Sequence, residues 1–291
     1  GTYFQILVQP VYEILNSNID IRSIMPIFDR INEYIDLETE KSSDGNSDIV
    51  SIDEIEMKDV SFKYKNGSHA LNNINLKLPS KGIFAIVGDS GAGKSSLIKL
   101  LSAFYNSYDG EIRINKKELK SYGVSDIRSV ISLVSQDIEL LNKSIKDNIK
   151  MGRDIGEIQI KEVIEKLNLE ETINKLDSRY ETIINERINL SGGEKQRISI
   201  ARALVEDSLV YIFDEPTAAL DTINEKRVKD ILEELAKKRL VIIVTHNLSL
   251  LNKADCIYTM KNGEIVEKGS YETLIKGDTY FSKLMNELSK K

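Results

Sequence analysis

Short apolar runs, separated by segments with helical periodicity, dominate the pattern of the chain after residue 50. The runs Ile83–Val87, Leu209–Phe213 and Leu240–Val244 have the length and the β-branched content of buried strands. Strands that are apolar along their whole length belong to parallel sheets whose two faces are both covered. The pattern therefore predicts an α/β fold on a mostly parallel central sheet, with helices such as Ile223–Leu235 between the strands.

Alternating polar and apolar positions predict an antiparallel β element ahead of this sheet. The strand candidates Ile55–Tyr64 and Leu71–Leu78 flank an Asn66–Gly67 turn. A second hairpin is expected around Asn262–Gly263, before a closing helical tail. The residues expected to line one face of the second strand are Leu71, Ile74, Leu76 and Leu78. Further strands are predicted at Gly110–Ile114 and Val130–Val134.

Three regions depart from this strand pattern. Residues 138–204 carry mostly helical periodicity and predict an inserted α-helical subdomain. Residues 1–38 have apolar positions at three- and four-residue intervals, which is typical of an amphipathic helix. The polar run at 39–50 is expected to be a linker, so the compact domain spans 51–291. The apolar periodicity of the inserted region is carried by residues such as Ile158, Val163, Ile164 and Leu167.

Composition and charge exclude several classes of protein. The 291 residues are 41% hydrophobic, which suits a globular core, and the formal net charge of -6 shows no basic excess of the kind that suggests a nucleic-acid binder. The single cysteine, Cys256, precludes an internal disulfide, and its apolar neighbours predict a buried structural thiol. Because no apolar run is long enough to cross a bilayer, the chain as given is expected to be soluble.

A glycine-rich loop follows the strand Ile83–Val87 and precedes the helical segment Ser95–Leu101. It fits the pattern G-x-x-x-x-G-K-[ST], in which backbone N–H groups at a helix N-terminus face phosphate oxygens. Lys94 is then expected against the β- and γ-phosphates, and the Ser95 hydroxyl on Mg²⁺. A plain turn with a solvated lysine is the alternative. The expected nucleotide-binding residues are Gly88, Asp89, Ser90, Gly91, Ala92, Gly93, Lys94, Ser95 and Ser96.

Two carboxylates, Asp214 and Glu215, lie at the C-terminal end of the predicted strand Leu209–Phe213. Ligands of open α/β sheets bind at the carboxyl ends of the strands. Asp214 is expected to hold Mg²⁺ through water, and Glu215 to polarise the water that attacks the phosphate. Exposed acids at a strand end are the alternative interpretation, which the nearby phosphate loop disfavours.

The segment Leu190–Arg197 opens with Leu-Ser-Gly-Gly and resembles the signature turn of the ATP-binding cassette (ABC) ATPases. The resemblance covers about residues 50–275, with the motifs in the family's order. It implies a P-loop NTPase (RecA-like) core with an antiparallel β element and an inserted α-helical subdomain. It also implies that Ser191, Gly192 and Gly193 bind the ATP of a second ABC domain, so that two nucleotides are sandwiched in a dimer.

The same resemblance implies roles for four more residues. Tyr64 resembles the aromatic residue that stacks on adenine, and Gln136 the glutamine that touches Mg²⁺ and the attacking water. Asp221 resembles the aspartate that signals across the dimer, and His246 the histidine that contacts the γ-phosphate. With ATP and Mg²⁺ as cofactors, the expected catalytic residues are Glu215, His246, Gln136 and Lys94. The expected metal ligands are Ser95, Gln136 and Asp214.

Two segments resemble exporter-type cassettes in particular. Glu181–Ile188 keeps the charged pair Glu186 and Arg187 that precedes the signature in exporters, and Leu140–Ile149 resembles the segment after the glutamine. With the N-terminal helix and linker, the layout resembles the C-terminal half of a fused exporter, in which residues 1–38 end the last transmembrane helix. This implies a transmembrane-domain partner, no nucleic acid, and a place on the cytoplasmic face of the cell membrane.

The resemblance implies ATP-driven export, and the sequence leaves peptide, lipid and drug open as substrates. A soluble ABC ATPase that acts on nucleic acid or ribosomes is the alternative, but such proteins usually have two cassettes or a coiled-coil insertion. A nucleotide-gated regulatory module without turnover is a third possibility, which Glu215, His246 and the intact signature disfavour. Homodimer and heterodimer both remain open.

Overall fold

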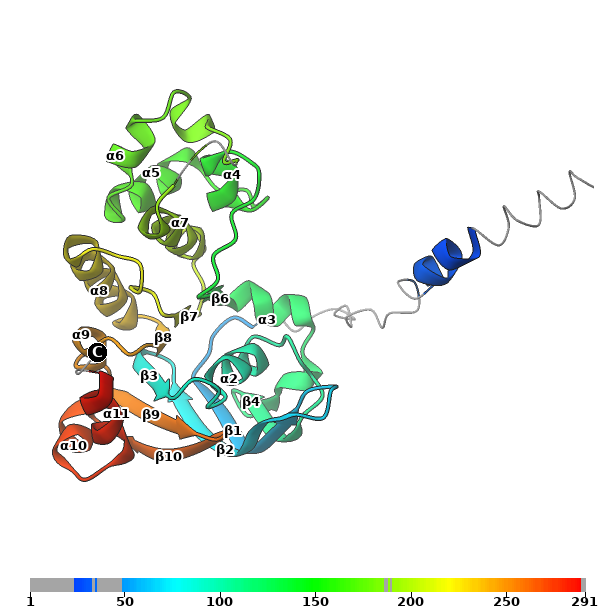
Figure 1. Cartoon of the computed structure of the whole chain (residues 1–291), viewed down its shortest axis with the longest axis vertical. Coiled ribbons are helices and arrows are strands. Elements are labelled where there is room, and N and C mark those ends of the chain that lie inside the picture. Colours follow the sequence, from blue (N-terminus) through cyan, green and yellow to red (C-terminus); the bar gives the residue numbers. More distant parts are fainter. Residues whose placement is uncertain (1–23, 33–34, 36–48, 186–187, 189, 289–291) are drawn as a thin grey trace, which may run out of the picture. The chain divides into compact units, whose positions relative to one another are not determined.

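The computed structural model describes residues 24–32, 35, 49–185, 188 and 190–288. The chain divides into two units, Gly1–Lys41 and Ser42–Lys291. In the first unit, residues 24–32 and 35 are helical (Figure 1), and all the apolar side chains described there are exposed. The rest of the predicted amphipathic helix, and the predicted linker up to residue 48, lie outside the described residues. None of the described helices combines the length and the hydropathy that crossing a membrane requires.

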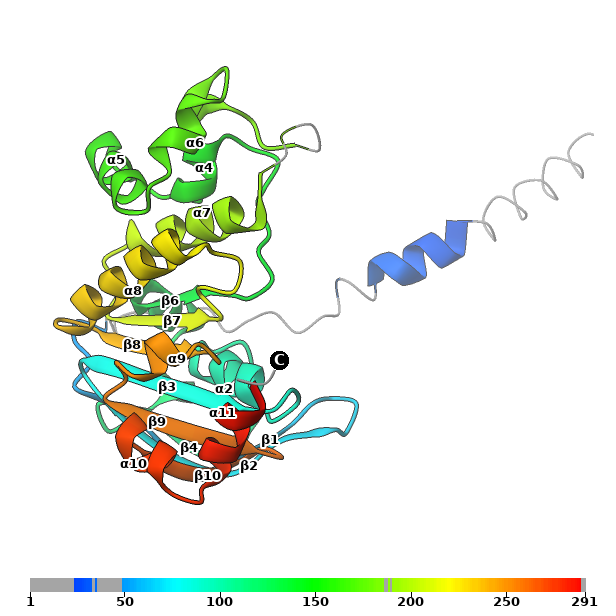
Figure 2. The ribbon, with the colours of Figure 1, turned by 60° about the vertical axis from the view of Figure 1, so that its left-hand side comes forward.

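The second unit contains a six-stranded central sheet in the order β10-β9-β3-β8-β7-β6 (Figure 2). All neighbouring strands are parallel except β9 and β10, which form the hairpin predicted at Asn262–Gly263. The prediction of a mostly parallel sheet is therefore confirmed. The strands are β3 (Gly82–Gly88), β6 (Ile131–Val134), β7 (Val210–Asp214), β8 (Leu240–Val244), β9 (Cys256–Lys261) and β10 (Glu264–Gly269).

A separate antiparallel sheet has the order β2-β1-β4-β5, as the alternating pattern predicted. The four residues expected on one face of β2 are all buried. Leu71 and Ile74 share that face although they are three residues apart, because the register shifts there and Asn73 has a φ of 49°. The strands are β1 (Glu54–Lys63), β2 (His69–Pro79), β4 (Asp109–Ile114) and β5 (Lys117–Glu118).

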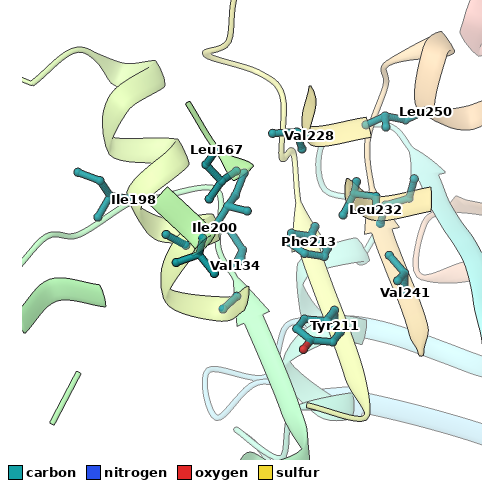
Figure 3. Close-up of a cluster of buried hydrophobic side chains, with 14 of the residues drawn as sticks. Val134, Leu167, Ile198, Ile200, Tyr211, Phe213, Val228, Leu232, Val241 and Leu250 are labelled. Carbon is teal, nitrogen blue, oxygen red and sulfur yellow. The ribbon is translucent and has the colours of Figure 1, made fainter. Parts of the chain in front are cut away.

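Two hydrophobic cores lie on opposite faces of the central sheet. Along β3, Phe84 and Ile86 belong to the core shared with the antiparallel sheet, with helix α2 (Lys94–Leu101) and with helix α3 (Val124–Val130). Ile83, Ala85 and Val87 alternate with them and belong to the other core. Figure 3 shows that second core around Tyr211 and Phe213 of β7. Because both faces are covered, the strands are apolar throughout.

The predicted helical insertion is present, and α7 lies between its smaller helices and the sheet (Figure 2). Ile158 lies in a helix, as its periodicity predicted, but its side chain is 74% exposed. The buried stripe of α5 begins at Ile160, two residues after Ile158. Two residues correspond to about 200° around a helix, so the Ile158 side chain lies on the opposite face. The helices are α4 (Ile145–Lys150), α5 (Glu157–Lys166), α6 (Glu170–Asn174) and α7 (Gly192–Leu204), with a 3₁₀ turn η2 (Arg179–Glu181).

The remaining helices connect or cover the strands. The strand predicted at Val130–Val134 begins one residue later, at Ile131, because Val130 is the last residue of α3. Cys256 is half-buried rather than buried, because β9 begins at the edge of the core. The closing helical tail is confirmed by α10 and α11. The elements not yet named are α8 (Thr222–Ala236), α9 (Leu248–Leu251), α10 (Tyr271–Lys276), α11 (Tyr280–Leu288) and the 3₁₀ turn η1 (Leu119–Ser121).

Candidate functional site

The glycine-rich loop connects β3 to α2 and leaves the start of that helix without a side-chain cap. Its last glycine, Gly93, is the N-cap residue and has a φ of 102°. A Cβ at Gly93 would lie 2.6 Å from the Ala70 carbonyl oxygen, so only glycine fits. Uncapped N–H groups at a helix N-terminus are a ready site for an anion such as phosphate.

The Lys94 side chain folds back along this loop. Its Nζ donates to the Gly88 carbonyl at 2.7 Å and to the Asp89 carbonyl at 2.8 Å. Burial lowers the pKa of Lys94, and the nearby carboxylates of Glu215, Asp214 and Asp89 oppose that shift. The loop therefore holds a positive charge close to the carboxylates that end β7.

Glu215 occupies a left-handed backbone conformation, with a φ of 50°, directly after β7. Its N–H donates to the Val244 carbonyl at 2.8 Å, and the Thr245 hydroxyl donates to its carboxylate at 3.3 Å. Burial raises the pKa of Glu215, and the charge of Asp214 raises it further. The end of β8 thus fixes both the backbone and the carboxylate of Glu215, and the raised pKa suits a proton acceptor.

His246 follows Thr245, and its Nε2 lies 3.9 Å from the Glu215 carboxylate. Burial lowers the pKa of His246, and the positive charge of Lys94 adds to that effect. The Nδ1 atom is buried and has no hydrogen-bond partner among the described residues. A lowered pKa keeps the imidazole neutral near pH 7, with one nitrogen able to donate a hydrogen bond.

A pocket of about 270 Å³ gathers the three residues expected to hold a metal, Ser95, Gln136 and Asp214. Burial raises the pKa of Asp214, Lys94 opposes that shift, and the charge of Asp137 adds to it. No group of three or more His, Cys, Asp or Glu side chains among the described residues could hold a metal ion alone. A hydroxyl, an amide and a carboxylate do fit Mg²⁺, which commonly binds few protein ligands together with substrate phosphates and water.

Tyr64 follows β1 and lies beside the helix that begins at the phosphate loop. Its hydroxyl is 2.7 Å from the Ser96 hydroxyl, with which it shares a hydrogen bond. Its ring packs edge-on against Phe62 and Tyr105, at centroid distances of 4.9 Å and 5.6 Å. An aromatic surface therefore adjoins the phosphate loop, as the adenine-stacking interpretation requires.

The Leu-Ser-Gly-Gly turn starts α7, and Ser191 is the N-cap of that helix. The Ser191 hydroxyl accepts from the Glu194 N–H at 3.2 Å, while the Glu194 carboxylate accepts from the Ser191 N–H at 2.8 Å. A Cβ at Gly193 would lie 2.8 Å from the Ala219 carbonyl oxygen. The turn therefore packs closely on the segment after β7 of its own chain.

Asp221, predicted to signal across a dimer, is the N-cap of α8. Its carboxylate accepts from the Asn224 N–H at 2.8 Å, which is the main cause of its lowered pKa. Among the described residues, Ser191, Gly192 and Gly193 do not hydrogen-bond with the Lys94 ammonium group. They also do not line the pocket at Asp214. Glu186 and Arg187 lie outside the described residues.

Gln196 is a site residue that the sequence interpretation did not assign. Its side chain is buried, donates to the Glu215 carbonyl at 2.7 Å, and accepts from the Ala219 N–H at 3.0 Å. The amide thus joins α7 to the segment that carries the Glu215 carboxylate. The local feature that could have pointed to Gln196 is its polar side chain at a position of α7 that is buried.

The chain matches the family model described as "ABC transporter" over residues 71–218. It is 35% identical over 282 residues to the ATP-dependent lipid A-core flippase of Escherichia coli K12, covering 96% of this chain and 48% of the flippase. The flippase of Shigella flexneri matches equally well. A solved bacterial Atm1-family ABC exporter with ATP bound superposes with a TM-score of 0.85 at 29% identity, covering 93% of this chain and 48% of the exporter. The chain spans about half the length of the curated relatives it matches.

Proposed function

Because this chain belongs to the ABC transporter family and carries its ATPase domain, we propose that it powers a membrane exporter by hydrolysing ATP in a dimer. The observation that carries the proposal is the pocket that gathers Ser95, Gln136 and Asp214 next to the phosphate loop. Lys94 and Glu215 lie close enough to each other, and to Asp214 in that pocket, to shift one another's pKa values. One compact region therefore contains groups for the phosphates, the metal and the attacking water.

In this proposal, ATP lies along the phosphate loop with its base on Tyr64. Lys94 neutralises the β- and γ-phosphates, and Ser96 adds a hydroxyl at the first turn of α2. Ser95, Gln136 and, through water, Asp214 would hold Mg²⁺, which neutralises charge that develops on the phosphate oxygens. Gly88, Asp89, Ser90, Gly91, Ala92 and Gly93 supply the backbone of the cradle.

Glu215 is the proposed base that accepts a proton from the attacking water. Its raised pKa and its two supports from the end of β8 favour this role. His246, kept neutral by its lowered pKa, would donate from Nε2 to the γ-phosphate. Gln136, which lines the same pocket as Asp214, would orient the water.

We infer that the site is completed by a second ABC domain. Ser191 and Gly192 are exposed at the N-terminus of α7, where N–H groups favour an anion. In a head-to-tail dimer they would face the γ-phosphate held by the other domain, with Asp221 at the same interface. ATP would then join the two domains, and loss of the γ-phosphate would separate them.

A transmembrane domain of the same transporter is the second proposed partner. Leu141 and Ile183 are 42% and 54% exposed, and an isolated β-bridge between Ser144 and Ile183 joins their two segments. These segments are the ones that resemble exporters. Residues 1–38 are proposed to end the last transmembrane helix, with the domain on the cytoplasmic face of the membrane. Peptide, lipid and drug remain candidate substrates, and lipid gains support because the flippase relatives are named for lipid A-core.

The first experiment is sizing by light scattering of the Glu215→Gln variant with MgATP and with MgADP. We expect a dimer with MgATP alone, because the variant would bind but not hydrolyse the nucleotide. The variant should also lose nearly all ATPase activity. Normal turnover by Glu215→Gln would contradict the assignment of the base, and a monomer in both nucleotides would contradict pairing of this chain with itself.

A further inference from the structure

The last helix of the chain reaches the phosphate loop. α11 packs against β3 and β10 (red in Figures 1 and 2), and its first residue is Tyr280. The Tyr280 hydroxyl donates a hydrogen bond to the carboxylate of Asp89, the second residue of the loop. The Lys261 ammonium lies 4.4 Å from the centroid of the same ring. Two parts of the chain that are 191 residues apart therefore meet at the candidate nucleotide site.

Tyr280 is held firmly enough to fix the position of its partner. The N–H groups of Tyr280 and Phe281 donate to the two carboxylate oxygens of Glu267 at 2.7 Å and 2.9 Å. An acidic group at this end also suits the helix dipole. The side chains of Phe281, Leu284 and Met285 are buried in the hydrophobic core. The phenol is therefore presented by an anchored helix end.

The backbone carbonyl and the side-chain carboxylate of Asp89 would affect a bound nucleotide in different ways. Its backbone carbonyl accepts from Lys94 and helps to place the ammonium group. Its carboxylate carries a negative charge on a loop whose task is to bind phosphates, so a carboxylate turned toward them would repel them. Burial and the hydrogen bond to Asp89 raise the pKa of Tyr280 to about 12, so the phenol remains a donor at neutral pH.

We propose that Tyr280 is a positioning residue for nucleotide binding, which holds the Asp89 carboxylate away from the phosphates while the Asp89 carbonyl stays on Lys94. This inference rests on the proposed function of the loop. The C-terminal helix thus contributes to ATP affinity without touching the nucleotide. A bond that merely fastened α11 to the domain would leave that affinity unchanged when it was removed.

The test compares the 291-residue chain with its Tyr280→Phe variant, using a fluorescent ATP analogue with Mg²⁺. We expect the Kd to rise about three- to tenfold, the range typical of losing one intramolecular hydrogen bond. The KM for ATP should rise by a similar factor, with little change in kcat. In an Asp89→Asn background, Tyr280→Phe should have almost no further effect, because no charge is left to restrain.

Tyr271→Phe is the matched control, because the Tyr271 ring packs on Phe281 in the neighbouring helix. It should leave the Kd unchanged. The inference would be overturned by an unchanged Kd in Tyr280→Phe, by an equal loss in the Asp89→Asn background, or by an equal loss in the control. If the parent chain itself failed to bind MgATP, the proposed function would fail instead.

Discussion

The ammonium group of Lys94 lies between two backbone carbonyls and close to three carboxylates. Burial lowers its pKa, and the three negative charges limit that shift. The side chain is therefore positioned before any phosphate arrives. Preorganisation of this kind increases affinity, because little side-chain freedom remains to be lost when the ligand binds.

Replacing Lys94 by alanine should weaken ATP binding itself. The variant removes the positive charge that offsets both Asp214 and Glu215, so phosphates would meet stronger repulsion from these carboxylates. Titration with a fluorescent ATP analogue should give a Kd at least about tenfold higher, which corresponds to about 1.4 kcal/mol. Lys99→Ala is a suitable control, since Lys99 lines the pocket from the next turn of α2. Unchanged ATP affinity in Lys94→Ala would contradict the assignment of the phosphate loop.

At the scale of elements, α7 links two functions through Gln196. The helix starts with the Leu-Ser-Gly-Gly turn, and its Gln196 amide bonds both to the Glu215 carbonyl and to the Ala219 N–H. A small rotation of α7 would therefore move the segment that carries Glu215. Within one chain, this connects the turn proposed to face a partner's ATP with the residue proposed as the base of the chain's own site.

Gln196→Leu should lower kcat about tenfold or more and leave ATP affinity nearly unchanged. The substitution removes two hydrogen bonds, at a cost of about 1–3 kcal/mol, and frees the turn around Glu215. Steady-state ATPase assays and nucleotide titration separate the two effects. The control is Gln159→Leu, an exposed glutamine at the start of α5. Equal loss of kcat and affinity would point to simple destabilisation.

Local signals explain which parts of the fold and site could be predicted from the sequence. The strands and the phosphate loop could be predicted, because apolar runs and glycine spacing act within a few residues. The contact of Tyr280 with Asp89 could not, since it joins residues 191 apart through the packing of α11. Ile158 lies in a helix as predicted, but its exposure could not be predicted, because a short helix offers several apolar stripes and only the core selects one. Asp221 has a local capping role, whereas the role proposed for it at a dimer interface needs a partner and has no counterpart in one chain.

At the scale of the whole molecule, a single chain holds parts of two different ATP sites in this proposal. The phosphate loop, Asp214 and Glu215 serve the chain's own nucleotide, while the Leu-Ser-Gly-Gly turn serves the partner's. A head-to-tail contact of this kind closes into a dimer with two equivalent sites. Two different defects, one in each half-site, should therefore complement one another when the chains are mixed.

Lys94→Ala and Gly192→Asp are the two variants for this test. An aspartate at position 192 suits the first turn of α7, and its Cβ would meet only the Ala219 methyl group at 3.4 Å, so the chain should fold normally. Its charge would nevertheless repel the γ-phosphate of the partner's ATP. Each variant alone should be nearly inactive, because every site in its dimers contains one defect.

In the mixture, a dimer of one chain of each kind has one site with both defects and one with none. Random pairing makes half of the dimers mixed, so ATPase activity should return to about a quarter of the wild-type value. Mixing either variant with itself supplies the baseline. If sizing showed mixed dimers but no activity returned, the Leu-Ser-Gly-Gly turn would act within its own chain. Head-to-tail completion of the site would then be wrong, whatever the role of the phosphate loop.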